Sequence, residues 1–253
     1  MIRGIAMAAA AIVLVGGTAR AHEFMIRADG PTAQAGAPLG FSVLSSHVFI
    51  TSQEMEPPDQ NRAGLFASGQ RSDATLRPDQ PTLSYRGRVR APSGTFILWG
   101  TRAGQVWAVT PDGLKEGNRR TPGATDSFVM EKFCKTLVNL SPDDPGFAAV
   151  TGDRLEIVPV SNPAKARPGE EMAVRVLYRG APVAGETVTA TYDGFSTEED
   201  TYAYSTKTGK DGVAKVKITH PGLWMVRVQH SAPERTDDYD RYVARAVLMF
   251  QVP

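Results

Sequence analysis

The sequence predicts an all-β fold made of two β-sandwich domains, the C-terminal one immunoglobulin-like. Short runs of β-branched and aromatic residues are broken by Gly, Pro, Asn and Asp at intervals of roughly ten residues, the spacing typical of a sandwich or barrel. Helical periodicity is nearly absent from the chain after its first segment. Of the 253 residues, 42% are hydrophobic, which is enough to form one large or two small cores.

Residues 1–21 have the three-part pattern of a secretory signal peptide. Arg3 gives a positive start, an uncharged apolar run extends from Ile5 to Val15, and Ala19 and Ala21 place small residues before a cleavage site. The run is shorter than the roughly 20 residues that a membrane-spanning helix needs. We therefore expect cleavage after Ala21, export to the periplasm, and a mature protein that begins at His22 and is not embedded in the membrane.

Residues 22–158 are predicted to form the N-terminal β-rich domain. Expected strands lie at Leu39–Leu44, Thr82–Val89, Thr95–Trp99 and Val106–Val109. The segment from Asp126 to Leu140 has apolar spacing that suits either a short helix or a pair of strands, and the sequence alone leaves both open.

Residues 159–253 are predicted to form the C-terminal sandwich. A Pro- and Gly-containing linker at 161–169 precedes six or seven short alternating strands, with a hairpin signal at Asp211-Gly212. In the strand that comes after Pro221-Gly222, Trp224 and His230 share one face, so we expect Trp224 in the core and His230 where the strand ends.

Composition argues against several classes of function. The 28 Lys and Arg residues nearly balance the 27 Asp and Glu residues, so a nucleic-acid partner is not expected. Phosphate-binding loops, nucleophile elbows and zinc-protease motifs are missing from the sequence, as is a convincing nucleophile–base pair, so an enzyme is not expected. The single cysteine, Cys134, rules out an intramolecular disulfide and is interpreted as a buried apolar residue.

A histidine at the first mature position suggests a metal ligand. Cleavage after Ala21 would give His22 a free α-amine, which together with its imidazole can chelate one metal ion. The alternative is that some residue must come after the cleavage site and chance has placed a histidine there. The chain has four histidines in all, His22, His47, His220 and His230; His220 lies in a Pro-Gly turn and is expected to be solvated.

The C-terminal half contains a set of characteristic segments: Leu155-Glu156-Ile157-Val158-Pro159, Asn162-Pro163, Tyr178-Arg179-Gly180-Ala181-Pro182-Val183-Ala184-Gly185, Lys210-Asp211-Gly212, Gly222-Leu223-Trp224 and His230. In these segments the chain resembles the DUF4198 family of exported proteins associated with nickel and cobalt uptake. At the mature start, His22-Glu23-Phe24 is similar to the family's His-Asp-Phe-Trp opening, with Met25 in place of the aromatic residue. Ser46-His47 falls where the family tends to have Gly-His, and Phe133-Cys134-Lys135 echoes its Ala-Lys-Ala-Leu segment, with Cys134 in place of Ala. The resemblance implies two β-sandwich domains and a metal-linked periplasmic role, with His22, His47 and His230 on matching segments.

These observations support three functions of different classes. The first, which we favour, is a non-catalytic periplasmic protein that binds Ni²⁺ or Co²⁺ through His22, His47 and His230. It would pass the ion to an uptake system, either a membrane transporter or an outer-membrane receptor. The second is a copper protein with an N-terminal histidine brace, acting as a chaperone or an oxidative enzyme. The third is a metal-free adhesion or assembly module.

Acidic residues lie close to His47 in the sequence. Glu54, Glu56 and Asp59 could supply an outer oxygen ligand, but a solvated loop is the expected arrangement. The acidic run 198–200 is likewise expected to be a solvated face. Imidazole and amine nitrogens suit Ni²⁺, Co²⁺, Cu²⁺ and Zn²⁺ alike, so the donor types do not choose the metal.

Overall fold

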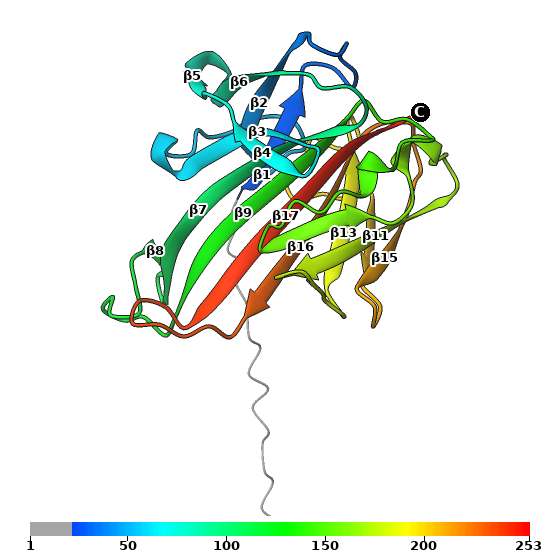
Figure 1. The fold of residues 1–253 in the computed structure, drawn as a ribbon. Coiled ribbons are helices and arrows are strands. Elements are labelled where there is room, and N and C mark those ends of the chain that lie inside the picture. Colours follow the sequence, from blue (N-terminus) through cyan, green and yellow to red (C-terminus); the bar gives the residue numbers. More distant parts are fainter. Residues whose placement is uncertain (1–21) are drawn as a thin grey trace, which may run out of the picture.

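The computed structural model describes residues 22–253, which form three stacked layers of β-sheet (Figure 1). The predicted signal peptide lies outside the described residues. The N-terminal sheet has the strand order β1 (Glu23–Ala28), β2 (Pro38–Ser46), β6 (Ser84–Arg90) and β5 (Arg77–Asp79). The C-terminal sheet contains β10 (Leu155–Pro159), β11 (Glu171–Tyr178), β12 (Ala181–Pro182) and β15 (Val213–Lys217).

A nine-stranded central sheet separates the two outer sheets. Its order is β14 (Tyr204–Lys207), β13 (Thr187–Tyr192), β16 (Gly222–Ala232), β17 (Arg241–Val252), β9 (Asp126–Val138), β7 (Phe96–Thr110), β3 (Asn61–Ala67) and β4 (Gln70–Asp73), with β8 (Gly113–Glu116) paired to β7. The last strand, β17, runs parallel to β9. The central sheet therefore contains strands from both sides of the predicted boundary at residue 158, and the two sandwiches share it.

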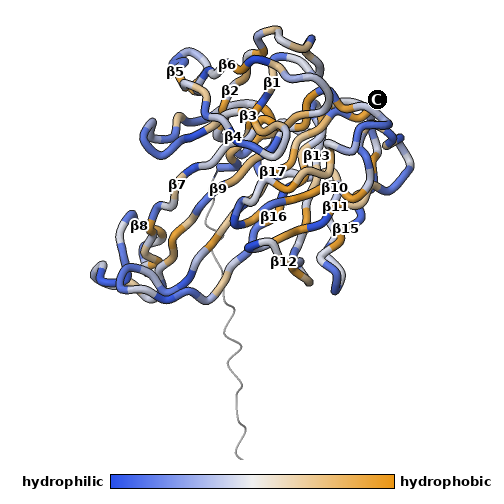
Figure 2. The backbone as a smooth tube through the Cα atoms, in the orientation of Figure 1, coloured by the Kyte–Doolittle hydropathy of each residue, from blue (hydrophilic) through white to orange (hydrophobic). Residues whose placement is uncertain are grey.

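Two apolar cores lie on the two faces of the central sheet. In β16, Trp224, Val226 and Val228 face the C-terminal sheet, whereas Met225 belongs to the core under the N-terminal sheet. Because both faces are covered, most of β17 and the 223–226 part of β16 are apolar runs rather than alternating ones. In Figure 2 the hydrophobic colouring tracks these strands, and hydrophilic residues dominate the connections at their ends.

The predicted all-β fold with two sandwich cores, the C-terminal one immunoglobulin-like, is confirmed. Trp224 is fully buried, as expected, and its indole nitrogen donates a hydrogen bond to the carbonyl oxygen of His220. The helical segments among residues 22–253 are four short 3₁₀ turns, at Pro58–Gln60, Gln80–Thr82, Pro145–Ala148 and Pro163–Lys165. None of the helical segments in this part of the chain has the length and apolar character that crossing a membrane would require.

Two segments have a secondary structure that differs from the one expected from the sequence. Asp126–Val138 is one strand, neither a helix nor a strand pair, because the sheets on both sides bury it and remove the alternation that marks a half-exposed strand. The separately predicted strands at 95–99 and 106–109 are both parts of the 15-residue β7. An irregularity between Arg102 and Gln105 shifts its register against β9, which explains why the alternation is interrupted there.

Candidate metal centre

The fold brings the first predicted ligand, His22, into contact with the second, His47. His22 directly precedes β1, and His47 comes directly after β2. These strands pair antiparallel with Glu23 opposite Ser46, so the residue before one strand lies beside the residue after the other. The two imidazole centroids are 4.2 Å apart, and the ring planes are tilted by 40°.

Each imidazole contacts a carboxylate through its Nδ1 atom. Glu54 Oε1 is 3.2 Å from His22 Nδ1, and Asp200 Oδ1 is 3.3 Å from His47 Nδ1. Glu54 lies on the connection after β2 and is fixed by a β-bridge to Ser45. Asp200 lies on the connection between β13 and β14, and its backbone N–H donates to the carbonyl oxygen of His47 at 3.1 Å. A loop from the second half of the chain thus contacts His47 through both a side chain and the backbone.

Asp200 is a site residue that the sequence reasoning missed. The run 198–200 was expected to be a solvated face, and Asp200 is indeed partly exposed, with 41% of its side-chain surface accessible. It nevertheless contacts His47 from 153 residues away in sequence. A contact between residues so far apart in the sequence cannot be recognised from the residues around either of them. Glu54, in contrast, lies only seven residues after His47 and is recognisable from the sequence as a candidate oxygen donor.

The shift in the pKa of His22 favours the neutral imidazole that a metal needs. Burial lowers this pKa; the negative charge of Glu54 opposes the shift, and His47 and Lys132 add to it. His22 therefore stays neutral to a lower pH than a free imidazole does. A neutral ring nitrogen keeps the lone pair that binds a metal ion.

A buried ionic cluster lies beneath the loop that carries Glu54. Glu56 Oε1 accepts hydrogen bonds from Lys132 Nζ at 2.6 Å and from Ser45 Oγ at 3.0 Å, and Oε2 accepts from Arg102 Nε at 3.1 Å. Burial raises the pKa of Glu56, but Lys132 and Arg102 outweigh this effect, so the net shift is downward. Burial lowers the pKa of Lys132, against the opposing charge of Glu56.

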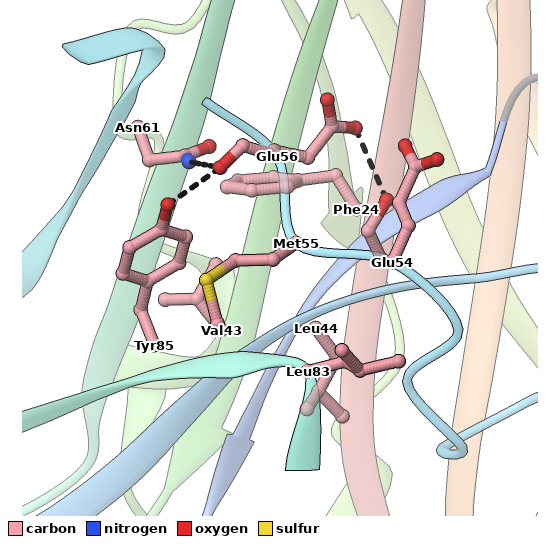
Figure 3. Close-up of a pocket in the computed structure, with 10 residues that line it drawn as sticks. Phe24, Val43, Leu44, Glu54, Met55, Glu56, Asn61, Leu83 and Tyr85 are labelled. Carbon is pink, nitrogen blue, oxygen red and sulfur yellow. Dashed lines mark hydrogen bonds between the residues drawn. The ribbon is translucent and has the colours of Figure 1, made fainter. Parts of the chain in front are cut away.

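The same loop is held from its other side by a filled pocket, shown in Figure 3. The hydroxyl of Tyr85 donates to the carbonyl oxygen of Glu56 at 2.6 Å, and the Asn61 amide donates to the same oxygen at 3.2 Å. Phe24 and Met55 lie beside these two side chains and line the same pocket (Figure 3). These contacts fix Glu54 and Glu56 in place and make the pocket a support for the histidine pair.

His230, the third predicted ligand, lies apart from the other two. It is on β16 three residues after Arg227, whose side chain contacts Glu23 on the face towards the N-terminal sheet. Since neighbouring residues of a strand point to opposite faces, an odd separation of three places His230 on the other face. There it packs on the ring of Tyr178, with 4.5 Å between centroids, and its Nδ1 is 2.8 Å from Glu186 Oε1. The predicted three-histidine set is therefore not assembled, because the central sheet lies between its members.

His220 and Cys134 do not belong to the His22–His47 pair. His220 stacks on Tyr192 with 4.7 Å between ring centroids, in the turn where it was expected. Cys134 is buried, as expected, and burial raises the pKa of its thiol well above the ordinary value. Within residues 22–253, no three His, Cys, Asp or Glu side chains stand grouped so that they could hold a metal ion.

Residues 19–232 match the family model described as a domain of unknown function, DUF4198. The chain belongs to the DUF4198 family. The family's description assigns it no activity. No curated protein matches the sequence.

Solved structures show distant similarity. The D0-D1 domain of Intimin is 13% identical, with 92% of this chain and 99% of that chain covered and a TM-score of 0.22. Mouse nectin-like molecule 4 is 12% identical, with 92% and 65% covered and a TM-score of 0.22. The Yersinia pseudotuberculosis adhesin InvE is 11% identical, with 91% and 59% covered and a TM-score of 0.22. At these TM-scores none of the three carries an argument about function.

Proposed function

We propose that the mature chain is a non-catalytic periplasmic protein that binds one divalent transition-metal ion through His22 and His47. The observation that carries the proposal is the 4.2 Å contact between the two imidazoles, at the position where processing would create a new α-amine. The proposal depends on export and on cleavage after Ala21, which would leave His22 as the first residue.

The contacts of the two rings indicate the donor atoms. An N-terminal histidine closes a small chelate ring with its own amine only through Nδ1, so the metal would replace the Glu54 contact at that atom. His47 has Nδ1 next to Asp200, which leaves Nε2 for the metal. A carboxylate that contacts the second nitrogen of a ligating imidazole orients the ring and increases its basicity. The donors would then be one amine and two imidazole nitrogens, and Glu54 is the carboxylate that contacts the His22 ring.

This reduced donor set also favours the copper alternative. With His230 on the far face, the arrangement is the amine-and-two-imidazole brace rather than a three-histidine site. For a given nitrogen site, affinity generally rises from Co²⁺ through Ni²⁺ to Cu²⁺. The family resemblance supports nickel or cobalt as cargo for an uptake system, and the donor set supports copper as the tightest binder in vitro.

The test is calorimetric titration of Ni²⁺, Co²⁺ and Cu²⁺ into two preparations of the protein. One begins at His22, and the other carries two extra residues ahead of it. We expect tight binding in the first form and its loss in the second, because the extension removes the free amine. Equal affinities in both forms would exclude the terminal chelate, and no binding in either would favour the metal-free assembly module.

Matched histidine variants locate the site. His47→Ala is expected to weaken binding at least roughly tenfold, since one lost metal ligand costs more than about 1.4 kcal/mol. His230→Ala and His220→Ala remove the same side chain on the far face or in a turn and are expected to leave the affinity unchanged. Equal losses in all three variants would show that the site lies elsewhere.

A further inference from the structure

The N-terminal sheet packs one face on the central sheet and leaves part of its other face open to solvent. In β2, Phe41 and Val43 are buried in the core beneath the sheet, whereas Ser42 between them is only half-buried. Neighbouring residues of a strand point to opposite faces, so Ser42 lies on the outer face. In β6, a Cβ on Gly87 would lie 2.2 Å from Phe41 Cζ, so Gly87 faces the core and the residues on either side of it face outward.

Arginines dominate the open part of this outer face. Five of them, which we call the arginine face, are Arg27 on β1, Arg77 on β5, and Arg86, Arg88 and Arg90 on β6. The carboxylates of Asp29 and Asp79 lie beside Arg86, so the arginine face carries more positive than negative charge. Since the whole chain has 28 basic and 27 acidic residues, this surplus is local and creates a positive potential over one surface of a nearly neutral protein.

Two of these arginines lie directly opposite each other. Arg77 pairs with Arg86 across β5 and β6, and the same row continues through Ser42 to Arg27. Arg86 has a bidentate partner in Asp29, with N–O distances of 2.9 and 2.7 Å. Within the described part of the chain, neither Arg27 nor Arg77 forms an ion pair. Like charges directly opposite on a sheet are destabilising, so an external anion beside these side chains would relieve the repulsion.

Arg88 and Arg90 extend the arginine face along β6. Both are exposed, and in the region that the structure describes neither forms an ion pair; Arg90 Nη1 donates to the carbonyl oxygen of Gly36 at 2.5 Å. Neighbouring strands are about 4.8 Å apart and the rise per residue is about 3.4 Å, so the five arginines span roughly 14 Å in each direction. A two-dimensional array of positive charges matches a flat anionic surface better than a linear polyanion, which a groove would follow.

We propose that the arginine face docks the protein on an anionic membrane surface, with the guanidinium groups against lipid phosphates. Guanidinium groups donate paired hydrogen bonds to phosphate oxygens, and anionic lipids attract clustered cationic side chains. The contact is peripheral, because it uses exposed side chains of a folded sheet. His22 and His47 take no part in it, so the proposal does not depend on metal binding.

The first test is co-sedimentation of the mature chain with lipid vesicles. One set contains phosphatidylglycerol and phosphatidylcholine, and the other contains phosphatidylcholine alone. We expect binding to the anionic vesicles only, with its loss when the salt concentration rises from about 0.1 M to about 0.5 M, because salt screens exposed charges. A lack of binding to the anionic vesicles, or equal binding to both sets, would overturn the proposal.

The second test neutralises three arginines that have no ion pair within the described residues. Arg27→Gln, Arg77→Gln and Arg88→Gln in one variant should weaken binding to the anionic vesicles at least roughly tenfold, since each charge near such a surface contributes. Replacing the same three residues by lysine keeps the charges and should leave binding like that of the wild type. Unchanged binding of the glutamine variant, or an equal loss in the lysine variant, would overturn the electrostatic docking.

A matched control removes three charges from the exposed face of the C-terminal sheet. It combines Arg175→Gln, Lys215→Gln and Lys217→Gln, whose side chains are exposed on β11 and β15. This variant should bind the anionic vesicles like the wild type, and a loss equal to that of the first glutamine variant would show that net charge and not the arginine face decides binding. Polyphosphate in solution tests the linear alternative: tighter binding of the wild type to polyphosphate than to the vesicles would overturn the membrane as the partner.

Discussion

Replacing Glu56 by alanine is expected to destabilise the protein more than the loss of any exposed ion pair. The carboxylate of Glu56 is the shared partner of Lys132 and Arg102, whose side chains are only 6% and 5% exposed. Glu56→Ala would leave both cations buried and facing each other across the vacated position. It would also remove the acceptor of the Ser45 hydroxyl.

The magnitude depends on the burial of the cluster. Removing one partner of a buried ion pair costs about 3–5 kcal/mol, because an uncompensated charge stays in the interior. Lys132 can relieve part of this cost by releasing its proton, since burial has already lowered its pKa. For Glu56→Ala we therefore expect a loss of about 3 kcal/mol at neutral pH, with a smaller loss at higher pH.

Urea unfolding of residues 22–253, monitored by circular dichroism, measures this effect. The matched control is Arg62→Ala, which breaks the exposed Arg62–Asp73 pair with side chains 68% and 57% accessible. Such a pair contributes about 0–1 kcal/mol. A Glu56→Ala variant no less stable than Arg62→Ala, with an unchanged denaturant slope, would refute the reasoning.

Because the pKa of Glu56 is lowered in the folded state, its stabilising contribution should be lost as the pH falls below its ordinary value of 4.5 and through the folded value.

Three further predictions address the metal, the thiol and the packing. Metal affinity should fall with pH, first as the α-amine (reference pKa about 7.7–8.0) and then, below about pH 6, as imidazole takes up protons that compete with the metal; calorimetric isotherms that agree between about pH 7.5 and 5 would contradict ligation by these nitrogens. Cys134, which is 1% exposed, should resist a thiol reagent such as dithionitrobenzoate until urea unfolds the chain, and rapid labelling of the native protein would disprove its burial. Gly87→Ala should cost about 1–3 kcal/mol in unfolding experiments, because overpacking is destabilising and its Cβ would lie 2.2 Å from Phe41 Cζ. Gly30→Ala, with its nearest atom at 3.6 Å, is the control, and an equal effect would show that Phe41 moves aside freely.

The fold class was predictable because strand alternation and turn residues are local signals. The exceptions are the strands of the central sheet. The segment 126–138 has apolar residues on both faces because a core lies on each side, so neither the period of a strand nor that of a helix stands out. The parallel pairing of β17 with β9 joins the last strand to a strand at the middle of the chain, and nothing in either strand alone indicates that partner.

The site was predictable only in part, because it depends on the pairing register of two strands and on which face of a strand each histidine occupies. His22 and His47 meet because β1 and β2 pair with a particular register, and the sequence predicted the strand at Leu39–Leu44 but neither β1 nor this register. The sequence places His230 on the same face as Trp224, and this is confirmed. What the sequence does not reveal is which of the two cores Trp224 enters, and that choice removes His230 from the pair.

The surroundings of the histidine pair favour a preorganised binding site over an adaptable surface. Two imidazoles 4.2 Å apart repel each other when both are protonated, and this repulsion contributes to the lowered pKa of His22. The pair is held in this contact by rigid neighbours on two sides, the Glu56 cluster under the loop and Glu23 with its two arginines under the first strand. These contacts exist before any ligand binds, so the binding of a metal ion would cost little side-chain conformational entropy. In the proposed metal site the terminal amine would be the third donor: the chain already holds both imidazoles, and cleavage after Ala21 would place the amine on His22 itself.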